Sequence, residues 1–337
     1  MINNKSSRPV TLKDIALKAG YSVNTVSRAL SDKNDISDKT KKLVREVANE
    51  LGYINNSVAT SLRSGYTKTI SIILGDISNP MFSILVKEME VFLRQKGYTS
   101  LILNTDESFI QEKKAITSSI SKKVDGIIIC PTQKDDSNIK LLKQNIPYVL
   151  IGRRFYNDTS DYVITNDFEG GYIATKYLLE KGHSKILNLV GPQYISSAKE
   201  RLEGSRKALL EKNIEPNFTL TKEIKIVSGG AYKTVQKAFK EGLKFDSIFA
   251  FNDLLAWESI LALNNLGLDV PNDVSVIGYD NIQSKLFFPF PLTTVSASKT
   301  KMAKMTVEIL LNKIEKKDNK THNAVLDVDL VIRNSTK

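Results

Sequence analysis

The chain has 337 residues, of which 41% are hydrophobic, so it can bury a sizeable core and form more than one domain. No apolar run approaches the roughly 18 to 20 residues needed to cross a membrane, and the polar first residues exclude a secretory signal. With a single cysteine, Cys130, no internal disulfide can form, and we therefore expect a cytoplasmic protein.

The formal net charge of +11 is unevenly distributed along the chain. Residues 1–64 carry 11 Lys/Arg and 6 Asp/Glu, whereas the remaining 273 residues carry 37 and 31. A small basic segment followed by a larger one with nearly equal numbers of positive and negative charges is typical of nucleic-acid binding. A merely lysine-rich surface would give the same charge counts.

Residues 11–51 predict three short helices. Thr11 with Asp14 forms a potential capping box, and Gly20 is placed to end the first helix. Ser22 and Ser37 are N-cap candidates for the second and third helices. The apolar positions expected to face inward are Leu12, Ile15, Ala16 and Ala19, then Val26 and Leu30, then Leu43, Val44, Val47 and Leu51.

After residue 68, short apolar runs alternate with amphipathic stretches of helical length. This alternation predicts two similar α/β subdomains with parallel sheets covered by helices on both faces. The opening between them, at the carboxyl ends of the strands, is the expected ligand site. The expected elements are Thr69–Leu74, Phe82–Lys96, Ser100–Leu103, Ile110–Ser121, Gly126–Cys130, Asn138–Gln144, Tyr148–Ile151, Lys185–Val190, Ala198–Lys212, Ile224–Val227, Tyr232–Glu241, Ser247–Phe251, Leu254–Leu266 and Val274–Gly278.

The first two helices fit a helix-turn-helix, which needs a small residue at the helix crossing, a turn glycine and apolar residues under the second helix. Ala16, Gly20 and the pair Val26 and Leu30 occupy those places. On the exposed face, Val23 and Asn24 would meet base edges, and Arg28 has the forked geometry for guanine. Residues placed to hold phosphates are Thr11, Ser22, Thr25 and Ser27.

The run from Thr11 to Leu30 resembles the headpiece of the LacI/GalR repressor family nearly residue for residue, and the resemblance extends over essentially the whole chain. It implies an all-α helix-turn-helix headpiece joined to a periplasmic-binding-protein-like (type I) core. The expected divisions are a headpiece at 1–56, a hinge helix and linker at 57–67, and an effector-binding and dimerisation core at 68–337. Within the core, we expect one subdomain at about 68–165 plus 298–323 and the other at about 166–297 plus 324–337.

The same resemblance implies a hinge helix near residues 56–63. A helix of about eight residues is too short to persist alone in water, so it would order against its dimer mate on DNA. By resemblance, Leu62 wedges into a minor-groove step, with Asn56, Ala59 and Arg63 as further DNA contacts. Asn55 departs from the family, which usually has proline before the hinge asparagine.

The resemblance also carries over a set of effector-binding residues. Arg201 and Asp280 match the family's effector-gripping arginine and acid, and both side chains suit hydroxyl-rich ligands such as sugars. Thr165 stands where many relatives have an acid, which weakens any inference to a particular sugar. Trp257 is expected to pack in the core, and His183 to lie in a structural turn. The remaining effector candidates are Ser78, Phe82, Ser83, Ser197, Phe249, Asn252 and Asp253.

These patterns predict a homodimeric repressor of carbohydrate-utilisation genes that binds a pseudo-palindromic DNA operator. An enzyme is disfavoured because the chain lacks phosphate-loop, GxGxxG, GxSxG and HExxH motifs, and we expect no metal or cofactor. A transport solute-binding protein would have no use for residues 1–64. A core that answers to a protein partner, and a purine-type repressor that requires a co-repressor, remain open alternatives.

Overall fold

The computed structural model describes residues 8–54, 61, 65–217, 220–224, 228–288, 290–316 and 320–337. The chain divides into two compact units, Met1–Gly65 and Tyr66–Lys337, here termed the headpiece and the core. Within the described residues, no helix combines the length and apolar character that a membrane span requires. The expected fold class, a helical headpiece followed by a two-sheet α/β core, is confirmed.

Over residues 8–54 the headpiece contains three short helices, α1 (Leu12–Ala19), α2 (Val23–Leu30) and α3 (Asp38–Glu50). Their ends follow the sequence signals: Gly20 closes α1 with φ of 72°, and the Ser22 and Ser37 hydroxyls accept from the amides of Thr25 and Thr40. All but one of the expected inward positions join one small apolar cluster. The exception is Leu43, whose side chain is 41% exposed because it lies on the outer face of α3.

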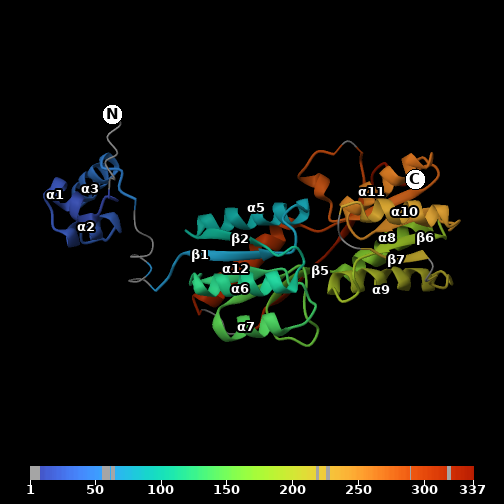
Figure 1. Cartoon of the computed structure of the whole chain (residues 1–337), viewed down its shortest axis with the longest axis horizontal. Helices are drawn as coiled ribbons and strands as arrows, with labels where there is room; N and C mark the ends of the chain where they lie inside the picture. The colour runs from blue at the N-terminus through green and yellow to red at the C-terminus, as the bar shows by residue number, and fades with distance from the viewer. Residues whose placement is uncertain are drawn as a thin grey trace. The chain divides into compact units, whose positions relative to one another are not determined.

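The first sheet of the core contains six parallel strands in the order β11-β5-β4-β3-β1-β2. Alternate residues of β1 point to opposite faces, so Ile72 packs with α5 and α12, whereas Ile73 packs with α6 and α7 (Figure 1). The strands are β1 (Thr69–Leu74), β2 (Thr99–Asn104), β3 (Gly126–Ile129), β4 (Tyr148–Ile151), β5 (Tyr162–Thr165) and β11 (Asn323–Leu326), and the helices are α5 (Pro80–Gln95), α6 (Phe109–Ser121), α7 (Ser137–Asn145) and α12 (Lys299–Ile314).

The second sheet has the order β12-β10-β9-β8-β6-β7, and only β12 runs antiparallel to its neighbour. Ile248 packs under α10 and α11, and its neighbour Phe249 packs under α8 and α9. The strands are β6 (Ile186–Val190), β7 (Thr221–Glu223), β8 (Ser247–Ala250), β9 (Ser275–Tyr279), β10 (Thr293–Ser296) and β12 (Asp329–Val331), and the helices are α8 (Asp167–Glu180), α9 (Ser196–Glu211), α10 (Gly230–Lys240), α11 (Asp253–Asn265) and the short 3-10 helix η2 (Ile282–Ser284).

Two details differ from the expected elements. The strand expected at 224–227 falls mainly on residues 225–227, which lie outside the described part of the chain; just before them, β7 at Thr221–Glu223 pairs with β6. The expected boundary at 323/324 falls inside β11, because Asn323 to Leu326 all pair with β5 of the first sheet. The chain therefore passes between the sheets after β5, after β10 and after β11.

Candidate functional site

The candidate DNA-reading surface is the outer face of α2. Val23, Asn24 and Arg28 are exposed there, while Val26 beneath them is fully buried. The Arg28 guanidinium is paired with the exposed carboxylate of Asp35. Since this pair is in water, it contributes little to stability, and guanine can replace the carboxylate as the partner of Arg28.

Three of the four candidate phosphate-binding residues, Thr11, Ser22 and Thr25, lie at helix starts, and Ser27 lies further along α2. Thr11 is exposed, and its hydroxyl donates to Asp14 at 2.7 Å. Ser22 is exposed and caps α2, whereas Thr25 and Ser27 are half-buried. Helix starts present unpaired amide N–H groups, which suit phosphate oxygens. The expected hinge contacts Asn56, Ala59, Leu62 and Arg63 lie outside the described residues.

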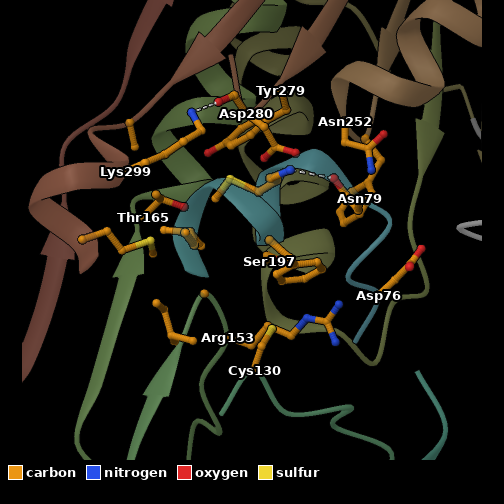
Figure 2. Close-up of a pocket in the computed structure, with 18 of the residues that line it drawn as sticks. Asp76, Asn79, Cys130, Arg153, Thr165, Ser197, Asn252, Tyr279, Asp280 and Lys299 are labelled. Carbon is orange, nitrogen blue, oxygen red and sulfur yellow. Dashed lines mark hydrogen bonds between the residues drawn. The ribbon is translucent and has the colours of Figure 1, made fainter. Parts of the chain in front are cut away.

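A cavity of about 100 Å³ lies within the core at the carboxyl ends of strands from both sheets. Figure 2 shows Asp280 and Lys299 at one end of this cavity and Cys130 and Arg153 at the other, with Ser197 between them. Parallel strands place the loops that follow them at one edge of a sheet, so residues distant in sequence converge here. The full lining is Asp76, Asn79, Met81, Phe82, Leu85, Glu107, Cys130, Ile151, Gly152, Arg153, Thr165, Ser197, Arg201, Phe251, Asn252, Tyr279, Asp280, Ala297, Ser298, Lys299 and Met302.

Arg201 is held rigidly in the cavity wall by α8 and β8. Its Nε donates to Asp167 Oδ1 at 2.8 Å, and its Nη1 donates to the carbonyl oxygen of Phe251 at 2.6 Å. The guanidinium lies 3.4 Å from the ring centroid of Tyr279, an arrangement that favours cations. Only 12% of the side chain is exposed. These contacts fix the orientation of Arg201 and use two of its five N–H donors, so its guanidinium can still donate to a ligand.

Asp280 supplies a buried acid beside this arginine. Burial raises the pKa of its carboxyl to about 6, although Arg201 and Lys299 oppose the shift. The Lys299 ammonium donates to the backbone carbonyl of Asp280 and is itself buried, so burial lowers its pKa. A carboxylate with so little water around it gains most from a ligand that donates hydrogen bonds.

The wall contributed by the first sheet combines apolar and polar side chains. Phe82, Leu85 and Ile151 form its apolar part. The two Nη atoms of Arg153 donate to the two carboxylate oxygens of Glu107 at 2.8 and 2.7 Å, so this ion pair is internally compensated. The other polar or charged side chains on this side are Asp76, Asn79, Thr165, Ser298 and Lys299.

The structure brings together five of the nine expected effector residues in this cavity, namely Phe82, Ser197, Arg201, Asn252 and Asp280. Ser78 and Ser83 are exposed and bond locally to Asp76 and to the carbonyl oxygen of Pro80. These two serines do not line the cavity, because the helix and loop carrying them turn their hydroxyls outward.

The other two expected residues lie behind the cavity. Phe249 points from the face of β8 into the apolar layer under α8 and α9. Asp253 is 1% exposed and holds the backbone amide of Ile282 and the hydroxyl of Thr294. Burial and the nearby Asp280 raise the pKa of Asp253 to about 7. Asp253 thus supports the loop that carries Asp280.

Trp257 and His183, which were expected to have structural roles and not to bind the effector, lie where the sequence predicts. Trp257 stacks on Phe288 with ring centroids 4.1 Å apart and packs against the core cluster under α10 and α11. His183 lies in the turn before β6, where its Nδ1 is 3.4 Å from Asp246. Within the described residues, no group of three or more His, Cys, Asp or Glu side chains is arranged to hold a metal ion.

Sequence reasoning missed several lining residues, including Asp76, Asn79, Glu107, Arg153 and Lys299. Asp76 and Asn79 belong to the segment from which Ser78 was chosen, so the segment was identified but the wrong side chain was selected. Glu107 and Arg153 follow β2 and β4, and polar residues that directly follow predicted strands were the available signal. Lys299 follows the return of the chain after β10, a strand that the sequence analysis did not predict.

Comparison with known proteins places these features in a family. Residues 11–56 match the model of bacterial regulatory proteins of the lacI family, and residues 67–334 match that of periplasmic binding proteins and the sugar-binding domain of the LacI family. The transcriptional repressor PurR of Aliivibrio salmonicida is 33% identical over 327 residues, covering 96% of this chain and 98% of the relative.

Solved structures give the same assignment. The lac repressor dimer bound to operator and the anti-inducer ONPF is 27% identical with a TM-score of 0.86, covering 98% of this chain and 99% of the other. The complex of the transcriptional regulator CelR with cellobiose is 27% identical with a TM-score of 0.74, covering 97% and 100% of the two chains.

Proposed function

Because this chain belongs to the LacI family, it is a DNA-binding transcriptional repressor with an effector-binding core, and we propose that its effector is a sugar or sugar derivative. The observation that carries the proposal is the placement of Arg201 and Asp280 in one cavity wall. A guanidinium and a carboxylate together can donate to and accept from the hydroxyls of one sugar ring. Phe82 and Phe251 add aromatic surface for the apolar face of such a ring.

The proposed DNA contacts follow from the exposed face of α2. Val23 and Asn24 meet base edges, Arg28 reads a guanine, and the hydroxyls of Thr11, Ser22, Thr25 and Ser27 hold phosphates. Asn56, Ala59, Leu62 and Arg63 form the hinge contacts, with Leu62 as a minor-groove wedge. The active species is a homodimer in the cytoplasm, and its two-fold symmetry matches a pseudo-palindromic operator.

Effector binding controls DNA binding through the equilibrium between arrangements of the core. A ligand shifts that equilibrium only by binding one arrangement more tightly than the other. Arg201 and Ser197 belong to the second sheet's layer, whereas Phe82 belongs to the first, so a ligand in the cavity contacts both halves of the core. Its presence therefore favours the arrangement in which both walls close on it.

The test is a thermal-shift screen of the full chain against cellobiose, o-nitrophenyl galactoside, ribose and hypoxanthine. A ligand that binds the native state raises the melting temperature by mass action. Asp280→Asn should abolish the shift produced by a sugar, because the amide loses the negative charge and puts a donating NH2 group in place of one accepting oxygen. Ser78→Ala, which changes an exposed serine outside the cavity, is the matched control and should respond like the wild type.

A purine base as co-repressor is the second candidate, since the curated relatives at 31–33% identity over nearly the whole chain are repressors named PurR. Phe82 and Phe251 could stack on a base as well as on a sugar. Stabilisation by hypoxanthine and by none of the sugars would select this candidate. If no small molecule shifts the wild-type melting temperature, a core that answers to a protein partner becomes the better explanation.

A further inference from the structure

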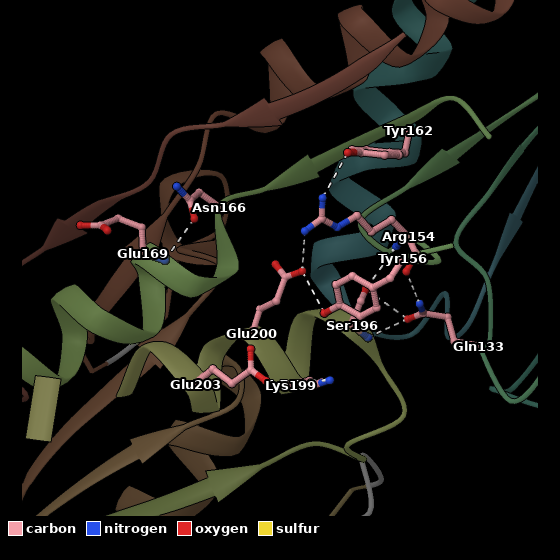
Figure 3. Close-up of polar contacts among 10 residues, drawn as sticks. All are labelled: Gln133, Arg154, Tyr156, Tyr162, Asn166, Glu169, Ser196, Lys199, Glu200 and Glu203. Carbon is pink, nitrogen blue, oxygen red and sulfur yellow. Dashed lines mark hydrogen bonds and ion pairs between the residues drawn. The ribbon is translucent and has the colours of Figure 1, made fainter. Parts of the chain in front are cut away.

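A polar cluster joins the two halves of the core at the start of α9, beside the face of that helix that lines the cavity (Figure 3). Gln133, Arg154 and Tyr156 come from loops that follow β3 and β4 of the first sheet. Ser196 and Glu200 come from the first turns of α9, which packs on the second sheet. We call these five residues the α9 latch.

Glu200 is the centre of one half of the latch. Its Oε1 accepts from Arg154 Nη2 at 2.9 Å and from the hydroxyl of Tyr156 at 3.0 Å. Arg154 Nη1 also donates to the hydroxyl of Tyr162 at 3.1 Å, which fixes the guanidinium against the first sheet. The neighbouring glutamate raises the pKa of Tyr156 further than burial alone, so the phenol keeps the proton that it donates.

Ser196 is the centre of the other half. Its backbone amide donates to Gln133 Oε1 at 2.9 Å, and its Oγ accepts from the backbone amide of Arg154 at 3.2 Å. Gln133 Nε2 donates in turn to the carbonyl oxygen of Arg154 at 2.6 Å. Gln133, Arg154 and Ser196 are therefore each hydrogen-bonded to the other two. These contacts attach the loops that follow β3 and β4 to the start of α9.

Burial distinguishes these contacts from ordinary surface pairs. Glu200, Gln133 and Ser196 are 9%, 8% and 4% exposed. A charged hydrogen bond at such a site costs more to break than one in water, since its partners are left unsatisfied. The other ion pair between the halves, Lys285 with Glu88 at 3.0 Å, has a lysine side chain that is 44% exposed and is correspondingly weaker.

The start of α9 presents the cavity and the latch on adjacent faces. Ser197 and Arg201 line the cavity, while Ser196 and Glu200, each one residue earlier, hold the latch. Helix α9 also packs closely against α8, because a Cβ at Gly171 of α8 would lie only 2.0 Å from the carbonyl oxygen of Arg201. Since the cavity residues and the latch residues belong to the same turns of one helix, a shift of α9 displaces both sets.

We propose that the α9 latch holds the cleft between the two halves of the core closed, and that Glu200 is a positioning residue through which latch strength sets effector affinity. The proposal rests on the effector site proposed above. Opening the latch lowers the population of the closed form, and apparent affinity falls by the same factor. Glu200 acts through the position of Arg201 and touches no ligand itself.

Cys130 provides a readout that requires no ligand. It is the only cysteine of the chain, it lines the cavity, and it is 2% exposed. Burial raises the pKa of its thiol to about 12, so the closed form reacts slowly with thiol reagents. The rate at which dithiobis(nitrobenzoate) modifies the full-length protein therefore measures how often the cleft opens, and a Cys130→Ser variant gives the blank.

Glu200→Gln and Gln133→Ala should each speed this modification roughly tenfold, since each weakens a buried hydrogen-bonded contact between the halves. The matched control is Glu203→Gln, one turn further along α9, because Glu203 pairs only with Lys199 of the same helix at 3.9 Å. Its rate should stay within about twofold of the wild type, as expected for an exposed pair.

Equal rates in Glu200→Gln, Gln133→Ala and Glu203→Gln, with unchanged melting, would overturn the proposal. Should Glu200→Gln lower the melting temperature as well, Tyr156→Phe replaces it, because it removes one hydroxyl from a half-exposed ring and should give roughly a threefold increase. A Tyr156→Phe rate equal to the wild type would then count against the latch. If sugars do not slow the modification of Cys130 in the wild type, the proposed effector class is wrong. The comparison of modification rates among the unliganded variants would still test the latch.

Discussion

In the headpiece, the side chains offered to DNA stand on the outside of α2, above an apolar cluster drawn from three short helices. In the core, the side chains proposed to bind the effector line an internal cavity, where 12% of the Arg201 side chain is exposed and Asp280 is partly buried. A surface that reads DNA needs only its supporting helices in place. A buried binding site needs every strand and loop around it, so its chemistry depends on the packing of the whole core.

This contrast implies that glycines should tolerate substitution differently in the two units. A Cβ at Gly204 of α9 would lie 1.9 Å from the carbonyl oxygen of Phe168, so Gly204→Ala must push α8 and α9 apart. We expect a loss of about 3 kcal/mol in core stability, at the upper end for overpacking. Urea unfolding followed by fluorescence of Trp257, the only tryptophan, measures this in the core alone.

Gly20→Ala in the headpiece is the comparison variant. Its Cβ meets no heavy atom within 4 Å, and only the left-handed φ of 72° opposes it. We expect a cost of about 1 kcal/mol, borne by the headpiece, with the Trp257 transition unchanged. If the core of Gly204→Ala were as stable as that of the wild type, α8 and α9 could not pack as closely as the structure shows.

The buried acids predict a pH dependence confined to the core. The pKa of Asp280 is about 6 in the folded state and lies near its ordinary value in the unfolded chain, so the folded core binds more protons between these values. Stability relative to Asp280→Asn should therefore fall by about 2 kcal/mol as the pH rises from 4 to 7. Effector affinity should change in the opposite sense, because the carboxylate that accepts hydrogen bonds forms as the pH passes 6.

Both quantities come from one titration series of Trp257-detected unfolding with and without sugar. Asp280→Asn serves as the reference at each pH because its side chain does not titrate. Parallel stability curves for the two proteins from pH 4 to 7 would show that Asp280 is solvated and would remove the physical basis of this prediction.

The exposed surface of the headpiece predicts a smaller effect, on DNA alone. Arg28→Ala should cost about 2 kcal/mol on operator DNA and relax preference at one base pair, because a bidentate guanine contact is lost. Binding to a set of single-base operator variants, measured at fixed salt, checks both parts. Arg45→Ala, an exposed arginine of α3 paired with Asp32 at 2.9 Å, is the control and should leave base preference unchanged.

The headpiece could be predicted from the sequence more completely than the core, because its features depend on neighbouring residues and those of the core depend on distant ones. The headpiece signals are local: Thr11, Gly20, Ser22 and Ser37 each act within four residues, so their placement could be predicted. In the core, the alternation of strands and helices predicted the two sheets, because buried strands are apolar along their length. The antiparallel pairing of β12 with β10 depends on residues 35 apart and had no local signal.

The cleft shows the same limit at the level of single side chains. Arg201, Ser197, Asn252 and Asp280 were identified by resemblance, since each belongs to a recognisable motif. Ser83 is predicted together with its neighbour Phe82, but the rotation of α5 places only Phe82 in the cavity and turns Ser83 outward. The Glu107–Arg153 pair joins two loops 46 residues apart, so no motif could indicate that they meet.

The smallest predicted effect isolates a local signal in the headpiece. Ser37→Ala removes the hydroxyl that accepts from the Thr40 amide at 3.2 Å, leaving one of the first amides of α3 without its cap. We expect a loss of about 1 kcal/mol in headpiece stability, seen as faster hydrogen exchange along α3. Because the cap belongs to the headpiece and Trp257 to the core, Trp257-detected unfolding should not change. A shift of the core transition would mean that the two units unfold together, so that stability could no longer be assigned to each unit separately.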